Sequence, residues 1–209
     1  MPRIDDYRAA IRLAREKLAA APFEQTLTRS GFEAAGEGLL RVPFLDRVYR
    51  VRHPGFDFLD EADPVRDVPL QEQVLLLHYL LGAGPPAAPG EWVAYREIPG
   101  AGFYFSAFVK RAVDPLKNRF GRDPDAFRSA AGRLGGGAVA TGDAGFEFRV
   151  LPYVSLQLIL YAADDEFPAE ATILFERQIA GRLSPEDIAW LAGMLVYRLI
   201  ALSRTPPAA

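Results

Sequence analysis

The chain contains 209 residues, 50% of them hydrophobic and 24% charged, with a formal net charge of −3 at pH 7. These values are typical of a globular protein with one sizeable core, and a mildly acidic chain without a long basic block disfavours nucleic acid as a partner. The sequence has no cysteine, which excludes disulfides, thiol catalysis and iron–sulfur or zinc sites built on thiolates of this chain.

We expect no membrane-related segment from the pattern of apolar residues. The first residues are charged and lack the apolar core of a signal peptide, and no later run approaches about 18 consecutive apolar residues. We therefore expect neither a membrane-spanning helix nor a membrane partner, and a cytoplasmic location.

The first third of the chain predicts a helix, a hairpin and an acidic loop. Apolar residues near the N-terminus recur every three or four positions, which predicts an amphipathic helix over residues 3–20. The runs Leu39–Leu45 and Val48–Arg52 favour a two-stranded hairpin, in which Pro43 indicates an edge strand or a bulge. The stretch Asp57–Asp67 lacks the ligand order of a calcium-binding loop, so we interpret it as a solvated loop.

The central part combines a strongly apolar helix with a strand that ends at glycines. Residues 69–82 begin with proline, end with glycine and carry leucine around most of their circumference, which predicts a core helix that contains His78. Residues 92–98 predict a strand that runs into Pro99-Gly100-Ala101-Gly102, and residues 103–113 predict a further helix.

A capping box marks the last helix. In Ser184-Pro185-Glu186-Asp187, serine caps, proline takes the first helical position and an acid follows three residues on, with Asp in place of the usual Glu or Gln. This pattern predicts a helix over residues 185–203, followed by a frayed tail at 205–209. The elements together predict a single α+β domain over residues 1–209, with an antiparallel or mixed sheet and helices packed on it.

Three consecutive acids lie within the most hydrophobic part of the chain. Leu156–Tyr161 and Ala171–Phe175 predict buried strands that flank Asp164, Asp165 and Glu166. Adjacent carboxylates repel, so the triplet could bind a hard cation, hold a basic group or supply an acid–base carboxylate. The alternative is a turn whose acids face water or cap a neighbouring helix.

Histidine chemistry depends on two residues, of which His78 is the better placed. Among leucines, it is either a core histidine satisfied by hydrogen bonds or a neutral metal ligand or base. The metal site that the sequence allows therefore combines His78 with Asp165 and Glu166.

The glycine-rich segment after residue 98 is a candidate anion site. Backbone N–H groups between a strand and a helix can cradle a phosphate or carboxylate, and Arg96 would support such a site. A dinucleotide fingerprint would need glycine at Phe105, and no lysine completes a P-loop, so nucleotide binding is disfavoured. The alternative is that Gly100 and Gly102 only allow a tight turn.

Four motifs carry a resemblance to a known family, and it extends from about Leu70 to Leu202. They are LLLHYLLG, WVAYREIPGAGFY, LPYVSLQLILYAADDEFPAEATILFE and LSPEDI. In this order they resemble an uncharacterised domain-of-unknown-function family of anaerobic bacteria and archaea. The resemblance implies one α+β domain and no established activity. Some relatives are joined to cysteine-rich iron–sulfur segments or associated with corrinoid and one-carbon metabolism, so any cluster would belong to a partner of this cysteine-free chain. Tyr161 stands where relatives often carry Trp.

Three functions follow as hypotheses. The first is an accessory module that binds a small molecule or cofactor in a pocket. The second is a divalent-metal-dependent enzyme that uses the acidic triplet with His78, and the third is a structural homodimer joined through the N-terminal helix and the proline-rich loop at residues 83–90. The expected pocket residues are Arg96, Gly100, Gly102, Tyr104, Tyr153, Asp164, Asp165 and Glu166.

Overall fold

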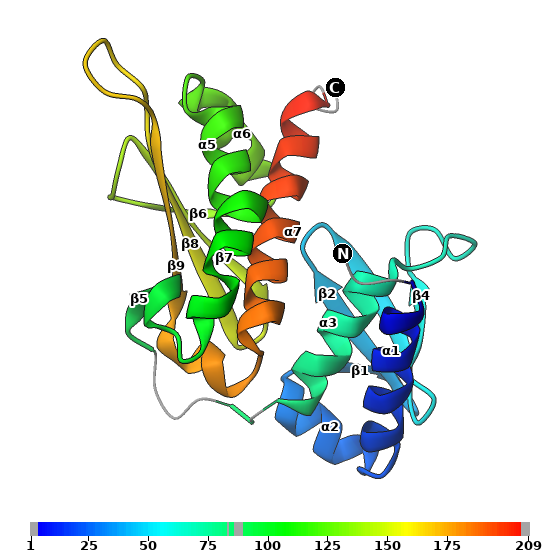
Figure 1. Ribbon diagram of the computed structural model, residues 1–209. Coiled ribbons are helices and arrows are strands. Elements are labelled where there is room, and N and C mark those ends of the chain that lie inside the picture. Colours follow the sequence, from blue (N-terminus) through cyan, green and yellow to red (C-terminus); the bar gives the residue numbers. More distant parts are fainter. Residues whose placement is uncertain (1–3, 83, 86–89, 206–209) are drawn as a thin grey trace. The chain divides into compact units, whose positions relative to one another are not determined.

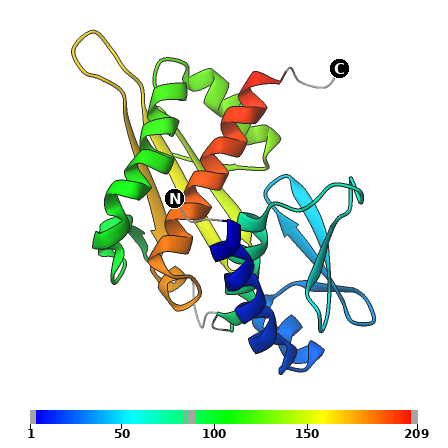
Figure 2. The same ribbon diagram turned by 45° about the vertical axis from the view of Figure 1, so that its right-hand side comes forward.

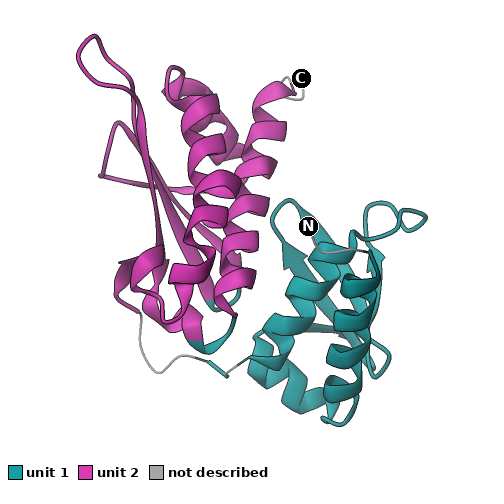
Figure 3. Cartoon of the chain, in the orientation of Figure 1, with its two compact units in different colours: residues 1–88, 151–153, 181–183 teal, residues 89–150, 154–180, 184–209 magenta. Residues whose placement is uncertain are grey.

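The fold is α+β, as the sequence predicts. The computed structural model describes residues 4–82, 84–85 and 90–205, and it contains two antiparallel sheets together with helices (Figure 1 and Figure 2). The chain divides into two compact units (Figure 3). Unit 1 comprises Met1–Ala88, Leu151–Tyr153 and Gly181–Leu183, and unit 2 comprises Pro89–Val150, Val154–Ala180 and Ser184–Ala209. The prediction of one domain over the whole chain stays a prediction.

Unit 1 pairs a four-stranded sheet with helices, and its sheet has the strand order β1-β2-β3-β4. The predicted hairpin is confirmed, because β2 pairs with β3 antiparallel from Leu39↔Arg52 to Phe44↔Arg47. Pro43 lies in an inner strand, but β1 pairs only with the first residues of β2, so Pro43 has a strand neighbour on one side only. The elements of unit 1 are α1 (Ile4–Ala19), α2 (Phe23–Ser30), β1 (Glu33–Gly36), β2 (Leu39–Phe44), β3 (Arg47–Arg52), β4 (Asp57–Asp60) and α3 (Leu70–Leu81).

The helices predicted at residues 3–20 and 69–82 are α1 and α3, which pack on each other. Residue 3 lies outside the described residues. The apolar stripe of α1 buries Ile11, Ala14 and Leu18, while α3 buries most of its circumference, as its leucine content predicts.

The first part of the acidic stretch at residues 57–67 is a strand, so the prediction of a solvated loop is wrong there. Asp60 ends β4 and is 1% exposed. Its carboxylate accepts hydrogen bonds from the Arg47 guanidinium and from the Ala62 N–H group. Burial opposes ionisation, but these hydrogen bonds and the Arg47 charge outweigh it, so the pKa of Asp60 is lowered. The ion pair with Arg47, a residue that sequence periodicity does not indicate as a partner, therefore stabilises the buried Asp60 carboxylate.

A second buried polar pair joins the sheet to α3. The Tyr49 hydroxyl group on β3 donates to the Glu72 carboxylate in the first turn of α3, and both residues are buried. Burial, together with the hydrogen bond to Glu72, raises the pKa of Tyr49. The hydroxyl therefore stays protonated and keeps donating across the physiological pH range.

Unit 2 contains a five-stranded sheet with the order β5-β9-β8-β7-β6. The predicted strands around the acids are confirmed as β8 and β9, which pair antiparallel from Leu156↔Phe175 to Tyr161↔Glu170. The elements of unit 2 are β5 (Trp92–Ala94), η1 (Tyr95–Glu97), η2 (Ala101–Tyr104), α4 (Phe105–Phe108), η3 (Val109–Val113), α5 (Asp114–Phe120), α6 (Pro124–Arg133), β6 (Gly137–Val139), β7 (Ala144–Leu151), β8 (Val154–Tyr161), β9 (Glu170–Glu176), η4 (Arg177–Gly181) and α7 (Pro185–Arg204).

Two elements of unit 2 differ from the predicted ranges. The strand expected at residues 92–98 stops at Ala94, because the Glu97 carboxylate accepts from the Ala94 N–H group at 2.7 Å and closes the short helical turn η1. The helix expected at residues 103–113 continues to Phe120, because a π turn at η3 precedes Pro115. The wider turn relieves the clash that proline makes with the carbonyl four residues earlier in a regular α-helix.

The long helix α7 holds the helical layer of unit 2 together. It packs against α4, α5, α6 and η3, and α5 and η3 also contact β9, so these helices lie along one face of the sheet (Figure 2). Gly193 allows this packing, since a Cβ atom there would lie 3.2 Å from the Arg111 carbonyl oxygen.

The predicted capping box at the start of α7 is confirmed. The Ser184 Oγ accepts from the Asp187 N–H group at 3.2 Å, and Asp187 Oδ2 accepts in return from the Ser184 hydroxyl at 2.7 Å and its N–H group at 3.3 Å. Of the predicted tail at 205–209, Thr205 is held by a hydrogen bond from its hydroxyl to the Ala201 carbonyl at 3.2 Å, and residues 206–209 lie outside the described residues. Within the described part of the chain, every helix is too short or too polar to cross a membrane.

We expect Asp60→Asn to lower the free energy of unfolding by about 2–3 kcal/mol at pH 7, since it leaves the partly exposed Arg47 without its charge partner. The lowered pKa of Asp60 stabilises the fold above the usual Asp value of about 3.9 and stops doing so as pH falls through the folded value. The difference between wild type and variant should therefore shrink from pH 5 to pH 2 in urea unfolding experiments.

The matched control is Asp57→Asn on the same strand, whose ion pair with Arg15 has a 73% exposed carboxylate side chain. This substitution should cost less than about 1 kcal/mol. Equal losses in the two variants would contradict the role assigned to Asp60.

Ser184→Ala should lower the free energy of unfolding by about 1 kcal/mol, because it removes the acceptor for the Asp187 N–H group. Ser203→Ala, which removes a hydroxyl that donates to the Ile200 carbonyl in the last turn of the same helix, serves as the control and should change stability by less than about 0.5 kcal/mol. Chemical denaturation followed by circular dichroism measures both, and an unchanged midpoint for Ser184→Ala would contradict the capping role.

Candidate functional site

The predicted pocket residues fall into three separate places. Arg96, Gly100, Gly102 and Tyr104 occur within η1, η2 and the turn between them, in unit 2. The acidic triplet lies in the turn between β8 and β9, also in unit 2. Tyr153 belongs to unit 1. Within the first group, Arg96 lines one hollow, whereas Gly100 and Gly102 border another.

Arg96 lies at a small hollow of 250 Å³ whose walls are mostly apolar. Its guanidinium carbon lies 3.7 Å from the centroid of the Phe105 ring, a cation–π contact. Because the Phe105 ring takes one face of the guanidinium, the N–H donors around its edge remain available. The residues that line this hollow are Ala94, Tyr95, Arg96, Phe105, Phe108, Val109, Val113, Ala171, Thr172 and Ile173.

The wall behind Arg96 is a packed aromatic cluster. The Tyr95 and Phe108 rings stack with centroids 4.3 Å apart, and Phe175 of β9 meets both rings edge-on. Burial raises the pKa of Tyr95 to about 12, so its hydroxyl stays protonated and donates to the Pro185 carbonyl at 2.7 Å. The hollow therefore has a rigid floor that is fixed to the start of α7.

The charge at this hollow is positive. Arg96 is exposed and makes no ion pair with any described residue, and none of the lining residues given above is an acid. The adjacent Glu97 is used elsewhere, because it caps η1 and lies 4.0 Å from Arg177. An apolar hollow with one uncompensated guanidinium is suited to a ligand with an anionic group and an apolar body.

The glycine segment forms a turn. Ala101 donates its N–H group to the Ile98 carbonyl at 3.0 Å, and Gly100 has φ 79 and ψ −3, which is a type II turn with Pro99 and Gly100 at its centre. Gly102 is not required sterically, since a Cβ atom there would meet nothing within 4 Å. Gly100, Gly102 and the 93% exposed Phe103 border a second hollow of 490 Å³.

Tyr104 forms a hydrogen bond with Glu186 in the first turn of α7. Its pKa is raised by the charge of Glu186, by burial and by a hydrogen bond with the Glu186 carboxylate. The phenol therefore positions the η2 segment on α7.

Tyr153 takes part in a buried cluster of unit 1 that the sequence analysis did not find. The Tyr79 hydroxyl accepts from the Tyr153 N–H group at 3.2 Å and donates to the Ser30 carbonyl at 2.7 Å. Arg182, only 5% exposed, lies with its guanidinium carbon 4.6 Å from the centroid of the Tyr153 ring and donates to the Gly84 carbonyl. Because these contacts join segments far apart in sequence, no local pattern indicates them.

The acidic triplet forms a turn. Asp164 Oδ1 accepts from the N–H groups of Glu166 at 2.9 Å and Phe167 at 2.7 Å, and the Asp164 N–H group donates to the Phe167 carbonyl at 3.0 Å. Asp165 and Glu166 are exposed, and the triplet borders neither the hollow at Arg96 nor the one at Gly100. This geometry corresponds to the alternative in which the acids shape a turn and face water.

The residues considered for a metal belong to different units. His78 is half-buried on α3 in unit 1, whereas Asp165 and Glu166 are in unit 2. Among the residues that the structure describes, no three His, Asp or Glu side chains are grouped so that they could hold a metal ion.

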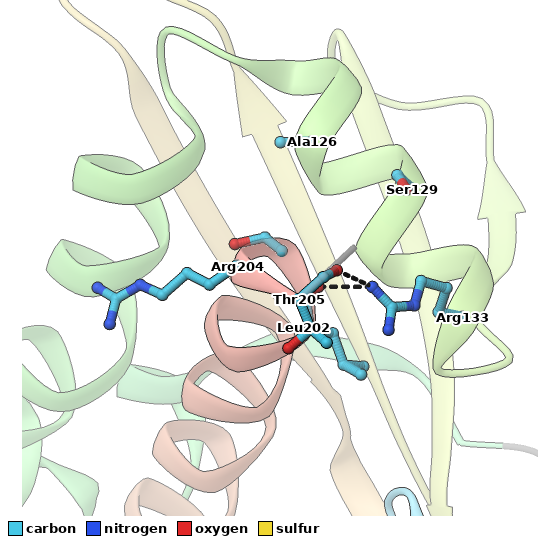
Figure 4. A pocket seen from close by; sticks show the side chains of 7 residues that line it. Ala126, Ser129, Arg133, Leu202, Arg204 and Thr205 are labelled. Atoms are coloured by element: carbon cyan, nitrogen blue, oxygen red, sulfur yellow. Dashed lines mark hydrogen bonds between the residues drawn. The ribbon is translucent and has the colours of Figure 1, made fainter. Parts of the chain in front are cut away.

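A third hollow in unit 2, of 350 Å³, lies where α6 and α7 end (Figure 4). Two arginines, Arg133 and Arg204, line it, and Arg133 donates from Nη1 to the carbonyls of Leu202 and Thr205, at 2.7 Å each. These bonds satisfy carbonyls at the end of α7, where a cation also complements the helix dipole. Arg133 is thus used as a helix cap, which makes this hollow a weaker candidate than the one at Arg96.

Comparison with known proteins gives one match. No curated protein and no solved structure is similar enough to match this chain. The model of a family described as a domain of unknown function, DUF3786, matches residues 22–198, a range that covers most of both units and begins after α1. The resemblance to a domain-of-unknown-function family is thereby confirmed, and the chain belongs to the DUF3786 family.

Proposed function

We propose that this chain is a binding protein for a small molecule that carries a carboxylate or phosphate on an apolar body. The ligand occupies the hollow at Arg96, with its anionic group on the guanidinium and its apolar part against the aromatic wall. The observation that carries the proposal is the exposed Arg96 guanidinium, placed over Phe105 and not paired with any described carboxylate.

The electrostatics of the hollow favour this class of ligand. A hydrogen bond to a charged group contributes about 1.5–3 kcal/mol, and a guanidinium can form two parallel bonds to one carboxylate or phosphate. The stacking on Phe105 restricts the rotamers of Arg96 before the ligand arrives, so less entropy is lost on binding.

The size of the hollow limits the ligand. Its volume of 250 Å³ lies below the range of about 300–1,000 Å³ that is usual for drug-sized ligands, so a small metabolite fits better than a dinucleotide. Gly100 and Gly102 keep a supporting role in the proposal as the turn that leads from η1 to η2, and Tyr104 as the contact that fixes η2 to α7.

The metabolic setting of the proposal comes from the family resemblance. An accessory role in cytoplasmic corrinoid, iron–sulfur or one-carbon metabolism would give the chain a cofactor protein as its partner, and any cluster would belong to that partner because this chain has no cysteine. We do not propose the divalent-metal enzyme, since Asp164 is used in a turn and His78 lies in the other unit.

The test uses benzoate and phenyl phosphate as probes with the full chain. Titration monitored by NMR should shift the backbone amide signals of Arg96, Phe105 and Thr172, and Arg96→Gln should weaken binding at least about tenfold, which equals about 1.4 kcal/mol. The dissociation constant of Arg96→Lys should lie between those of the wild type and Arg96→Gln, because lysine keeps the positive charge and loses the planar guanidinium.

The matched control is Arg149→Gln, which removes an exposed arginine on β7 of the same unit. It should leave the dissociation constant unchanged. The proposal fails if neither probe shifts the signals around Arg96, or if Arg96→Gln binds as wild type does.

A further inference from the structure

A fourth hollow lies in unit 1 between α1 and α3. It has a volume of 420 Å³, and its residues come from two turns of α1 and the first turn of α3. The lining residues are Arg8, Ile11, Arg12, Arg15, Glu16, Leu70 and Gln73. Among the lining residues, three guanidinium groups and one carboxylate give a formal charge of +2, and two carboxylates outside the lining, those of Asp5 and Asp57, pair with Arg8 and Arg15.

The spacing of the arginines explains why they share the hollow. Arg8, Arg12 and Arg15 follow one another at steps of four and three residues, so they lie along one face of α1. Ile11 and Leu70 give the hollow an apolar part, since α1 and α3 pack on each other there.

The ion pairs that these arginines make within the protein are weak. Arg8 lies 3.9 Å from Asp5 and Arg12 lies 3.3 Å from Glu16, and all four side chains are more than half exposed. Exposed pairs of this kind contribute about 0.2–1 kcal/mol, so a ligand of higher charge density can replace them.

Arg15 supplies the second observation. Its Nη1 atom lies 3.0 Å from an Asp57 carboxylate oxygen, but its Nε–H group is buried and has no hydrogen-bond partner among the described residues. Because this Nε–H group is buried, a ligand in the hollow would contact Arg15 through its outer Nη groups, and the site depends on the three guanidinium groups beside an apolar wall.

We infer that this hollow binds the phosphate group of a small molecule. A phosphate monoester carries a charge of about −1.5 to −2 at neutral pH and offers three acceptor oxygens, which complements the formal charge of +2 and the guanidinium donors. The site lies in unit 1 and uses none of the residues of the Arg96 hollow, so it is independent of the function proposed above.

The experiment follows the Nε–H signals of arginine by NMR in the full chain while inorganic pyrophosphate is added at constant ionic strength. The signals of Arg8, Arg12 and Arg15 should all shift, because all three side chains line the hollow. Arg12→Gln and Arg15→Gln should each raise the dissociation constant at least tenfold. Arg66→Gln, which removes an exposed arginine of unit 1 outside the hollow, should leave it unchanged.

Folding and the source of the phosphate are tested separately. Arg15→Gln should keep the wild-type circular dichroism spectrum, so that its loss of binding is not a loss of fold, and Arg96→Gln should still bind pyrophosphate. Vesicles that contain phosphatidic acid form the second arm, and binding to these vesicles with no response to pyrophosphate would overturn the inference of a small soluble ligand. Unchanged arginine signals at millimolar pyrophosphate would also overturn the inference. An increase in the dissociation constant of Arg66→Gln as large as that of Arg12→Gln or Arg15→Gln would do the same.

Discussion

The hydroxyl group of Tyr79 is the contact on which the organisation of unit 1 depends. It donates to the Ser30 carbonyl and accepts from the Tyr153 N–H group, so one buried atom joins α2, α3 and a segment more than seventy residues later. Burial raises the pKa of Tyr79, so the hydroxyl keeps its proton and performs both roles at physiological pH. Gly31 completes the arrangement, because a Cβ atom there would lie 2.6 Å from the Tyr153 ring.

Several arginines of this chain fall into two groups, which differ in the contacts that they make within the protein. Arg182 is buried against Tyr153, and Arg133 caps the end of α7, so both contribute to the stability of the elements that they join. Arg96 and the arginines of α1 lie at hollows, and their contacts within the protein are a single aromatic ring or exposed ion pairs. Since arginine binds carboxylates and phosphates well, the second group carries the functional proposals.

Local patterns predicted much of the fold. The capping residues of α7, the leucines of α3 and the apolar runs of β8 and β9 act on their own neighbours, so the sequence indicates them directly. The predicted pocket residues do not gather in one place: Arg96 lines one hollow, Gly100 and Gly102 border another, and the acidic triplet forms a turn elsewhere. Asp60 in β4 and Tyr153 have partners that are distant in sequence, and their positions could not be read from spacing alone.

Unit 1 is discontinuous in sequence, because Leu151–Tyr153 and Gly181–Leu183 belong to it while the chain around them belongs to unit 2. A continuous module can be copied or exchanged between genes in one piece and still bring all of its packing with it. A copy of the first 88 residues would lack the backbone donor of Tyr153 and the guanidinium of Arg182. A segment that carries residues 1–88 alone would therefore lack part of the packing of unit 1, and the family match extends into both units.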